Sequence, residues 1–285
     1  MGLDKQALER AIASWSPEDL FGSTLCGYGL ESGFSLHIFP DLVSTNQSLW
    51  NLIEAGATEG TVVLARRQSG GRGQWGRQWR SPEGGLYLSL ALKPDLPISQ
   101  AQILTLCSAW GIATVLRDRN IPVAIKWPND LVLDRRKLGG ILTETRLDGD
   151  RIHTAVVGVG INWTNPVPDH GINLHSFLSK KALPGVASLE QLAALTLQGM
   201  TYGYRYFRRY GIEHLLPSYL KLLTHLGRQA IVEGRPGIIT GVSPTGQLQV
   251  TLSSTASPSE DRSRDRNPSE ILLQPGTINL GYENL

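Results

Sequence analysis

The alternation of apolar and polar residues predicts a chain rich in β-strands. Between residues 86 and 92, leucine at every second position alternates with tyrosine, serine and alanine, which is typical of a strand with one face in the core. Similar short runs predict further strands at residues 35–39, 61–65, 123–127, 131–133, 138–145 and 152–159. Turn-like segments join the last four, so we expect antiparallel meanders.

Helical periodicity interrupts these strands. Residues 5–14 have a short amphipathic pattern, and residues 100–118 have a longer apolar one. Ser44, followed three residues later by Gln47, has the form of a capping box for a helix that runs to about Ala55. We therefore expect an α+β fold in which helices flank a mixed, largely antiparallel sheet.

The last third of the chain changes from helical to β patterning. A helical region runs from Ser188 to about Leu226, and Pro217 is expected to divide it into two helices. Beyond Gly227, short β-rich segments predict a small barrel, at residues 229–233, 237–242, 248–252 and 271–273. The insert at 253–270 lacks any large apolar residue, so we expect a mobile hairpin tip.

This patterning predicts three parts. Residues 1–40 are a lead-in segment, residues 41–226 form the main α+β domain, and residues 227–285 form the β-rich C-terminal domain. A length of 285 residues suits one large domain and one small one.

Composition narrows the classes of function. A hydrophobic share of 41% is ordinary for a globular protein, and a net charge of +2 is too small to predict nucleic-acid binding. Cys26 and Cys107 lie outside any CxxC or His/Cys spacing, so neither a disulfide framework nor a zinc site is expected. Residues 1–15 do not resemble a secretory signal, and the apolar stretch at 103–116 is shorter than the roughly 18 to 20 residues of a membrane span. We expect a cytoplasmic protein without a membrane partner.

The densest chemical signal is a glycine- and arginine-rich segment at residues 68–82, Gln-Ser-Gly-Gly-Arg-Gly-Gln-Trp-Gly-Arg-Gln-Trp-Arg-Ser-Pro. Its glycines permit positive φ and a close approach of the backbone to a ligand. Arg72, Arg77 and Arg80 supply forked cations that suit phosphate or carboxylate. The segment predicts an anion-binding loop, and a solvated basic turn is the alternative for the segment taken alone.

A second signal follows two of the predicted strands. The sequence Lys-Trp-Pro-Asn-Asp ends one strand at residues 126–130, and Lys137 opens the next, just before Gly139 and Gly140. Two lysines and a carboxylate could thus converge. The glycines of Gly-Val-Gly-Ile-Asn, at residues 158–162, would allow a flat ligand against the strand; a strand that leaves the sheet through a bulge explains them equally well.

Together these motifs resemble the biotin protein ligase family. The motifs, in order, are Ser-Thr-Asn at 44–46, GRGxxGRxWxSPxGGLYLS at 71–89, KWPND at 126–130, KLGGIL at 137–142 and GVGIN at 158–162. The resemblance covers about residues 40–225 and implies a class II synthetase-like catalytic domain, followed by a small SH3-like β-barrel. Some members carry an N-terminal winged-helix repressor domain; only 43 residues precede Ser44, so we expect the form without it and no DNA binding.

The resemblance implies an ATP-dependent ligation in two steps. The biotin carboxylate would attack the α-phosphate of ATP to give biotinyl-5'-AMP, and a lysine of the biotin carboxyl carrier protein would then attack the adenylate carbonyl. Biotin and ATP would be substrates, with Mg²⁺ held largely by phosphates and water. The oligomeric state, monomer or homodimer, stays open.

The resemblance also implies roles for individual residues. Expected catalytic residues are Lys137, Arg72 and Asp130, with Lys137 as the main cation and Asp130 as a candidate metal ligand. Expected biotin-binding residues are Ser44, Thr45, Asn46, Gln68, Gly71, Arg72, Gly73, Gln74, Lys137 and Gly140. Expected nucleotide-binding residues are Arg77, Trp79, Lys126, Asn129 and Asn162, with Trp79 as a stacking platform for adenine.

One departure and two alternatives accompany this interpretation. Gln74 stands where the family often has arginine, and a neutral amide cannot supply the guanidinium charge beside an adenylate. Within the superfamily, a lipoate or octanoate ligase or transferase is the alternative. From another class, a non-catalytic biotin sensor would share the binding residues but not release pyrophosphate.

Overall fold

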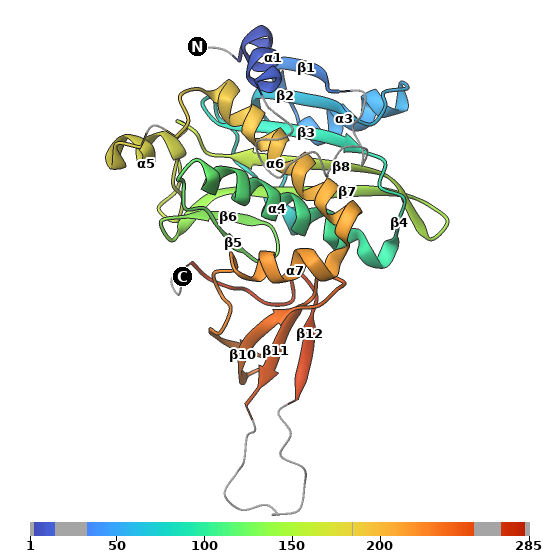
Figure 1. The fold of residues 1–285 in the computed structure, drawn as a ribbon, viewed down its shortest axis with the longest axis vertical. Helices are drawn as coiled ribbons and strands as arrows, with labels where there is room; N and C mark the ends of the chain where they lie inside the picture. Colours follow the sequence, from blue (N-terminus) through green and yellow to red (C-terminus); the bar gives the residue numbers. More distant parts are fainter. Residues whose placement is uncertain (1–2, 15–32, 184, 254–268, 283–285) are drawn as a thin grey trace, which may run out of the picture.

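Two β-sheets of unequal size organise the chain (Figure 1). The computed structural model describes residues 3–14, 33–183, 185–253 and 269–282. The strands of the larger sheet are β1 (Ser35–Leu42), β2 (Thr61–Gln68), β3 (Leu86–Leu92), β4 (Leu96–Pro97), β5 (Ala124–Lys126), β6 (Asp130–Leu133), β7 (Arg136–Asp148) and β8 (Arg151–Ile161).

The larger sheet has the strand order β1-β2-β3-β8-β7-β6-β5, and β4 pairs with β8. Its β1 and β2 run parallel, and the remaining neighbours run antiparallel. The predicted α+β fold with a mixed, largely antiparallel sheet is therefore confirmed.

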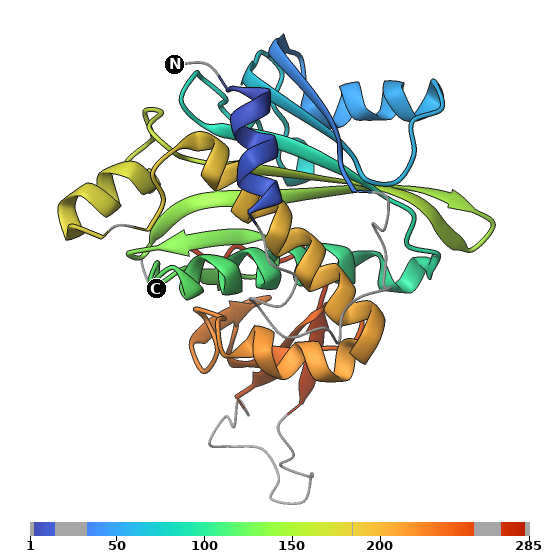
Figure 2. The same cartoon turned by 45° about the horizontal axis from the view of Figure 1, so that its top comes forward.

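Helices cover both faces of this sheet. On one face lie α4 (Ala101–Asp118) and α6 (Leu189–Tyr210), with α1 (Lys5–Ala13) against α6, as Figures 1 and 2 show. On the other face, α3 (Thr45–Glu54) packs on β2, β3 and β8. A short α5 (Leu174–Lys181), which the sequence analysis did not predict, follows β8.

The apolar helix α4 is buried on nearly all sides. Its residues from Ile103 to Val115 lie between the sheet and α6, apart from the half-exposed Thr114. Within the described part of the chain, Ile98–Asp118 is the one helix long and apolar enough to cross a membrane, and 67% of its most apolar window is buried. Its hydropathy is that expected of a helix in the core of the fold.

The position of β3 corrects one sequence expectation. Every residue of β3 is buried, so both faces of the strand are covered. Leu88 and Leu90 belong to the main core cluster on the side of α6, whereas Ala91 packs with Leu49 of α3. The side chains of β3 do alternate between the two faces of the sheet. The face that carries Tyr87, Ser89 and Ala91 is nevertheless buried under α3, because β3 lies in the centre of the sheet.

Two predicted helix signals also differ from the structure. Pro217 lies inside α7 (Ile212–Leu220), and α6 ends instead at Gly211, whose φ of 76° is readily adopted by glycine. Ser44 is the N-cap of α3, as expected, but its side chain makes no capping hydrogen bond. The backbone N–H of Thr45 donates to Gln68 Oε1 at 2.8 Å instead, so the capping-box interpretation is wrong although the helix start is right.

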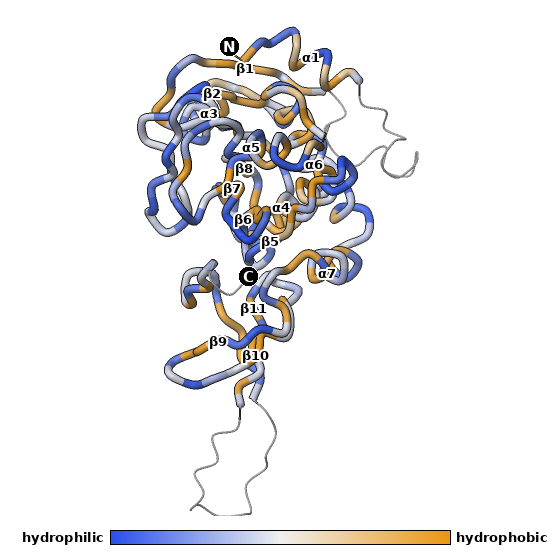
Figure 3. The backbone as a smooth tube through the Cα atoms, turned by 90° about the vertical axis from the view of Figure 1, so that its left-hand side faces the viewer, coloured by the Kyte–Doolittle hydropathy of each residue, from blue (hydrophilic) through white to orange (hydrophobic). Residues whose placement is uncertain are grey.

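The smaller sheet lies beyond α7, as Figure 3 shows. Its antiparallel strand order is β12-β11-β10-β9. Its strands are β9 (Gln229–Val232), β10 (Arg235–Val242), β11 (Leu248–Leu252) and β12 (Glu270–Leu273). Trp127, between β5 and β6, donates at 3.0 Å to the carbonyl of Gly246, between β10 and β11, which connects the two sheets. The four predicted strands are confirmed, and an SH3-like closure stays a prediction. Most of the predicted mobile insert, at 254–268, and much of the lead-in segment, at 15–32, lie outside the described residues.

Candidate active site

The candidate site lies on the face of the larger sheet that α3 covers. Pairing between strands sets Ser89 of β3, Gly158 of β8 and Leu142 of β7 side by side. A second row, one step along the same strands and β6, contains Tyr87, Gly160, Gly140 and Asp130. Directly paired residues share a face of a sheet, so motifs far apart in the sequence meet on one surface.

One end of this surface carries a set of hydrogen-bonded side chains, the polar array, which consists of Thr45, Asn46, Gln68, Ser81 and Ser89. Gln68 Oε1 accepts from the Thr45 N–H at 2.8 Å and from the Thr45 hydroxyl at 3.2 Å. Its Nε2 donates to Ser81 Oγ at 2.8 Å. Because the Thr45 N–H requires an acceptor, the orientation of the Gln68 amide is fixed.

Ser89 joins Asn46 to the polar array. Its hydroxyl lies 2.8 Å from Thr45 Oγ1 and 2.6 Å from Asn46 Oδ1, to which it can donate. Asn46 Nδ2 donates in turn to Glu144 Oε2 at 3.0 Å. An ionised carboxylate only accepts hydrogen bonds, so Glu144 determines which end of the Asn46 amide faces Ser89.

The two glycines of β8 make room for side chains of this chain. A Cβ at Gly158 would overlap Asn46 Oδ1, and one at Gly160 would lie 2.5 Å from Trp79 Nε1. The sequence allowed either a flat ligand against these glycines or a bulge. Asn46 and Trp79 lie directly over the two glycines, which nevertheless also line the cleft, so a ligand against this strand stays a prediction.

Lys137, Lys126 and Asp130 converge, as the sequence predicts. Lys137 Nζ lies 2.7 Å from Asp130 Oδ1, and Lys126 Nζ lies 3.8 Å from Oδ2. A register shift between β6 and β7 pairs Lys137 with Val132, on the same side as Asp130. From the C-terminal segment, Tyr282 donates its hydroxyl to Asp130 Oδ2, and its ring centre lies 4.2 Å from Lys126 Nζ.

Burial and charge shift the proton affinities of this cluster. Burial lowers the pKa of Lys126, assisted by Lys137 and Arg77 and opposed by Asp130. Burial and the Asp130 carboxylate raise the pKa of Tyr282, so that its hydroxyl stays protonated and can donate. Two ammonium groups face one carboxylate here, so the cluster suits an anionic ligand.

The glycine- and arginine-rich segment folds back on itself at the mouth of the cleft. The Gly73 N–H donates to the Arg77 carbonyl at 2.7 Å, and the Trp79 N–H donates to the Gly71 carbonyl at 2.9 Å. These bonds return the chain to the sheet and bring the Trp79 ring to β8. The ring centre lies 5.3 Å from Lys137 Nζ, so the loop and the cation cluster are in contact.

The tip of this loop reaches the C-terminal segment. Gln74–Gly76 forms a 3-10 turn in which Trp75 has a φ of 60°. The Trp75 ring is so close to Gly276 that a Cβ there would lie 2.7 Å from it. Gln74 and Trp75 both line the cleft, and the Trp75 contact links the loop to the segment that follows β12.

A cleft of about 1650 Å³ brings the predicted residues together. All of them except Gly71 line it, namely Ser44, Thr45, Asn46, Gln68, Arg72, Gly73, Gln74, Arg77, Trp79, Lys126, Asn129, Asp130, Lys137, Gly140 and Asn162. Asn129 donates to the Ile141 carbonyl at 2.8 Å and Asn162 to the Lys137 carbonyl at 3.4 Å. Both amides therefore support β7, the strand that carries Lys137.

Sequence reasoning missed four residues of the site. Ser89 could have been noticed as a polar residue in a leucine-rich strand, and Glu144 as a carboxylate on the strand of Lys137. His170, whose ring stacks on Tyr282 with centres 5.9 Å apart, and Tyr282 itself carry no local signal. The contact between them depends on how the C-terminal segment, which carries Tyr282, folds back over the cleft.

The site offers few metal ligands. The described ranges contain no group of three or more His, Cys, Asp or Glu side chains that could hold a metal ion. The carboxylates that line the cleft in this part of the chain are Asp41, which pairs with Arg67, and Asp130. A divalent cation would therefore depend mainly on oxygen atoms of a ligand and of water.

Comparison with known proteins identifies the family. Residues 39–162 match the family described as "Biotin/lipoate A/B protein ligase family". The bifunctional ligase/repressor BirA of Bacillus subtilis is 38% identical over 146 residues, which cover 50% of this chain and 45% of that protein. The chain thus spans less than half of that relative. BirA of Escherichia coli is 31% identical over 227 residues, which cover 77% of this chain and 70% of that protein.

A solved structure extends the likeness to the fold. The biotin protein ligase from Aquifex aeolicus in complex with biotin and ATP has a TM-score of 0.60 and 25% sequence identity, over 76% of this chain and 91% of that one. The family match at residues 39–162 spans all five motifs, and the match to the E. coli relative covers 70% of that protein. This chain belongs to the biotin/lipoate A/B protein ligase family.

Proposed function

We propose that the chain is an ATP-dependent biotin protein ligase. The observation that carries this proposal is that one cleft contains both the polar array and the Lys126–Lys137–Asp130 cluster. The array suits a neutral polar ring, and the cluster suits an anion. A ligand with a ureido ring at one end and a carboxylate at the other would satisfy both.

The array supports binding of the biotin ureido group. That group has two N–H donors and one carbonyl acceptor within a small ring, so it needs partners of both kinds in fixed positions. Thr45, Asn46 and Gln68 provide oxygen and nitrogen atoms whose orientations are set by their neighbours. Fixed orientation lowers the entropic cost of binding such a ligand.

The cluster supports formation of an acyl-adenylate. The biotin carboxylate and the α-phosphate of ATP are both negative, and their approach requires neutralisation. Lys137 is the main cation in this proposal, held by Asp130, and Arg72 is the second. The carboxylate oxygen attacks phosphorus, the bond to pyrophosphate breaks, and biotinyl-5'-AMP remains.

Nucleotide binding is assigned to the other half of the cleft. Its proposed residues are Arg77, Lys126, Asn129 and Asn162, which all line the cleft, and Trp79 is proposed as the platform for adenine. Mg²⁺ would neutralise phosphate charge there. Both oxygens of Asp130 already have partners, so Asp130 would be at most one ligand among phosphate and water oxygens.

The second step needs a protein acceptor. We propose that a lysine amine of a biotin carboxyl carrier protein attacks the adenylate carbonyl and releases AMP, and that this takes place in the cytoplasm.

Pyrophosphate release from ATP tests the first step. We expect release that depends on added biotin, followed by biotin transfer when a carrier domain is supplied. Stimulation by lipoate or octanoate and not by biotin would favour the lipoate branch of the family. Binding of biotin without pyrophosphate release would indicate a sensor.

A further inference from the structure

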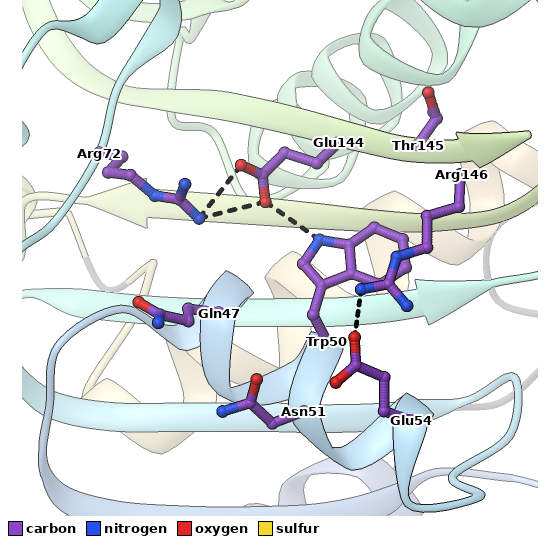
Figure 4. Close-up of a pocket in the computed structure, with 8 residues that line it drawn as sticks. All are labelled: Gln47, Trp50, Asn51, Glu54, Arg72, Glu144, Thr145 and Arg146. Atoms are coloured by element: carbon purple, nitrogen blue, oxygen red, sulfur yellow. Dashed lines mark hydrogen bonds and ion pairs between the residues drawn. The ribbon is translucent and has the colours of Figure 1, made fainter.

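A second pocket lies beside the cleft, between α3 and β7 (Figure 4). Its volume is about 480 Å³, and its lining residues are Gln47, Trp50, Asn51, Glu54, Arg72, Glu144, Thr145 and Arg146. Arg72 lines both this pocket and the cleft. Its guanidinium therefore lies at the boundary between the second pocket and the cleft. The contacts that hold it there can affect how the cleft binds a ligand.

Glu144 holds Arg72 on the side of the second pocket. Arg72 Nη2 lies 3.1 Å from Glu144 Oε1 and 3.4 Å from Oε2. The same carboxylate accepts from Asn46 Nδ2 at 3.0 Å and from Trp50 Nε1 at 3.2 Å. Figure 4 shows the carboxylate between the arginine and the indole. Glu144 thus connects the ligand-binding loop, α3 and the polar array.

The two halves of this ion pair are held very differently. Glu144 is only 26% exposed and accepts hydrogen bonds from Asn46 and Trp50 as well as from Arg72. Arg146 adds positive charge nearby, since its guanidinium lies 4.4 Å from the Trp50 ring centre. Arg72 is 48% exposed and belongs to a loop with glycine on both sides of it. Arg72 is therefore the partner that can move.

We propose that Glu144 is a positioning residue whose carboxylate is the resting partner of Arg72 and competes with the carboxylate of an incoming ligand. This inference rests on the proposed function, in which Arg72 binds the biotin carboxylate. Exchange of one carboxylate partner for another keeps the guanidinium paired, and Glu144 still has Asn46 and Trp50 as hydrogen-bond donors. Glu144 would then set how readily the cleft accepts a carboxylate ligand, while its bond to Asn46 keeps the polar array in order.

Calorimetric titration of the full chain with biotin and with biotinol tests the competition. Biotinol is the alcohol that lacks the carboxylate, so it does not need Arg72. With Glu144→Gln, we expect biotin to bind about two- to fivefold more tightly, the factor that a half-exposed ion pair contributes, and biotinol to bind as in wild type. Glu54→Gln is the matched control: it removes the Glu54–Arg146 pair, 2.5 Å long, from the same pocket and should change neither affinity.

A second variant separates competition from a structural effect. Arg72→Gln should reduce the preference for biotin over biotinol to what Lys137 alone provides, and Glu144→Gln added to it should change biotin affinity no further. Unchanged or weaker biotin binding by Glu144→Gln, or equal changes for biotin and biotinol, would overturn the inference. Failure of wild type to bind either compound would instead overturn the proposed function.

Discussion

Replacement of Lys137 by methionine isolates the charge on which the proposed chemistry depends. Methionine keeps an unbranched side chain that can lie beside Trp79, and it removes the ammonium group that is 2.7 Å from Asp130 Oδ1. The ammonium is 5.3 Å from the Trp79 ring centre, so the packing change is small. We expect an enzyme that folds and does not adenylate biotin efficiently.

The contacts of Lys137 indicate how much stability and how much catalytic rate the substitution should cost. Asp130 keeps Lys126 at 3.8 Å and the Tyr282 hydroxyl, so its carboxylate is not left without partners. The loss of stability should therefore stay below the roughly 3 to 5 kcal/mol of an orphaned buried charge, at about 1 to 2 kcal/mol. Loss of one preorganised contact to developing charge costs about 3 to 4 kcal/mol, or roughly 100- to 1000-fold in rate.

Biotin-dependent pyrophosphate release measures the loss of rate, and thermal unfolding measures the loss of stability. Arg136→Met is the matched control, because Arg136 is the neighbouring residue on β7 and its pair with Asp134, 3.5 Å long, is exposed on both sides. That control should cost less than about 1 kcal/mol and leave the rate unchanged. A rate for Lys137→Met within about threefold of wild type, in a protein of normal Tm, would refute the role of this lysine and the reasoning from the cluster.

Three further predictions concern separate parts of the molecule. Gly203→Ala should lower stability by about 1 to 3 kcal/mol, because a Cβ there would overlap the Cys107 carbonyl of α4, and thermal unfolding measures the loss. Gln74→Arg should slow dissociation of biotinyl-5'-AMP about ten- to a hundredfold if its charge reaches the adenylate, and an unchanged off-rate would contradict this. Burial, and to a lesser extent the charge of Lys126, lowers the pKa of His225 in the folded protein from 6.5 to about 4. Between pH 4 and pH 6.5 this histidine is therefore protonated in the unfolded chain and neutral in the folded one. Stability should therefore fall by up to about 3 kcal/mol as the pH decreases from 6.5 to 4, and the decrease in Tm should be shallower in His225→Asn.

Local patterns in the sequence determined most of the secondary structure. The period of two in β3 and the apolar run of α4 specify their elements, because those patterns reflect the spacing of side chains along a strand or helix. The resemblance to biotin protein ligases likewise depended on motif order alone. The convergence of Lys126, Asp130 and Lys137 followed from strand-and-turn reasoning, since these residues flank a short antiparallel connection.

Other features depended on which elements meet. The sequence of β3 could not reveal that both faces would be buried, because that follows from its place between β2 and β8 and from α3 on the outer side. Pro217 is a strong local breaker, yet the helix ended at Gly211, where the positive φ gives the chain its turn.

The residues that contact the site's charged side chains were determined by tertiary structure alone. Tyr282 meets Asp130 across 152 positions of the sequence, and Glu144 meets Arg72 across 72. Contacts of this kind require the C-terminal segment to cross the cleft and the loop to lie beside β7. The sequence thus determined which residues could bind anions and polar rings, whereas only the fold decided which partners hold them, because hydrogen bonds and ion pairs depend on distance in space and not on spacing along the chain.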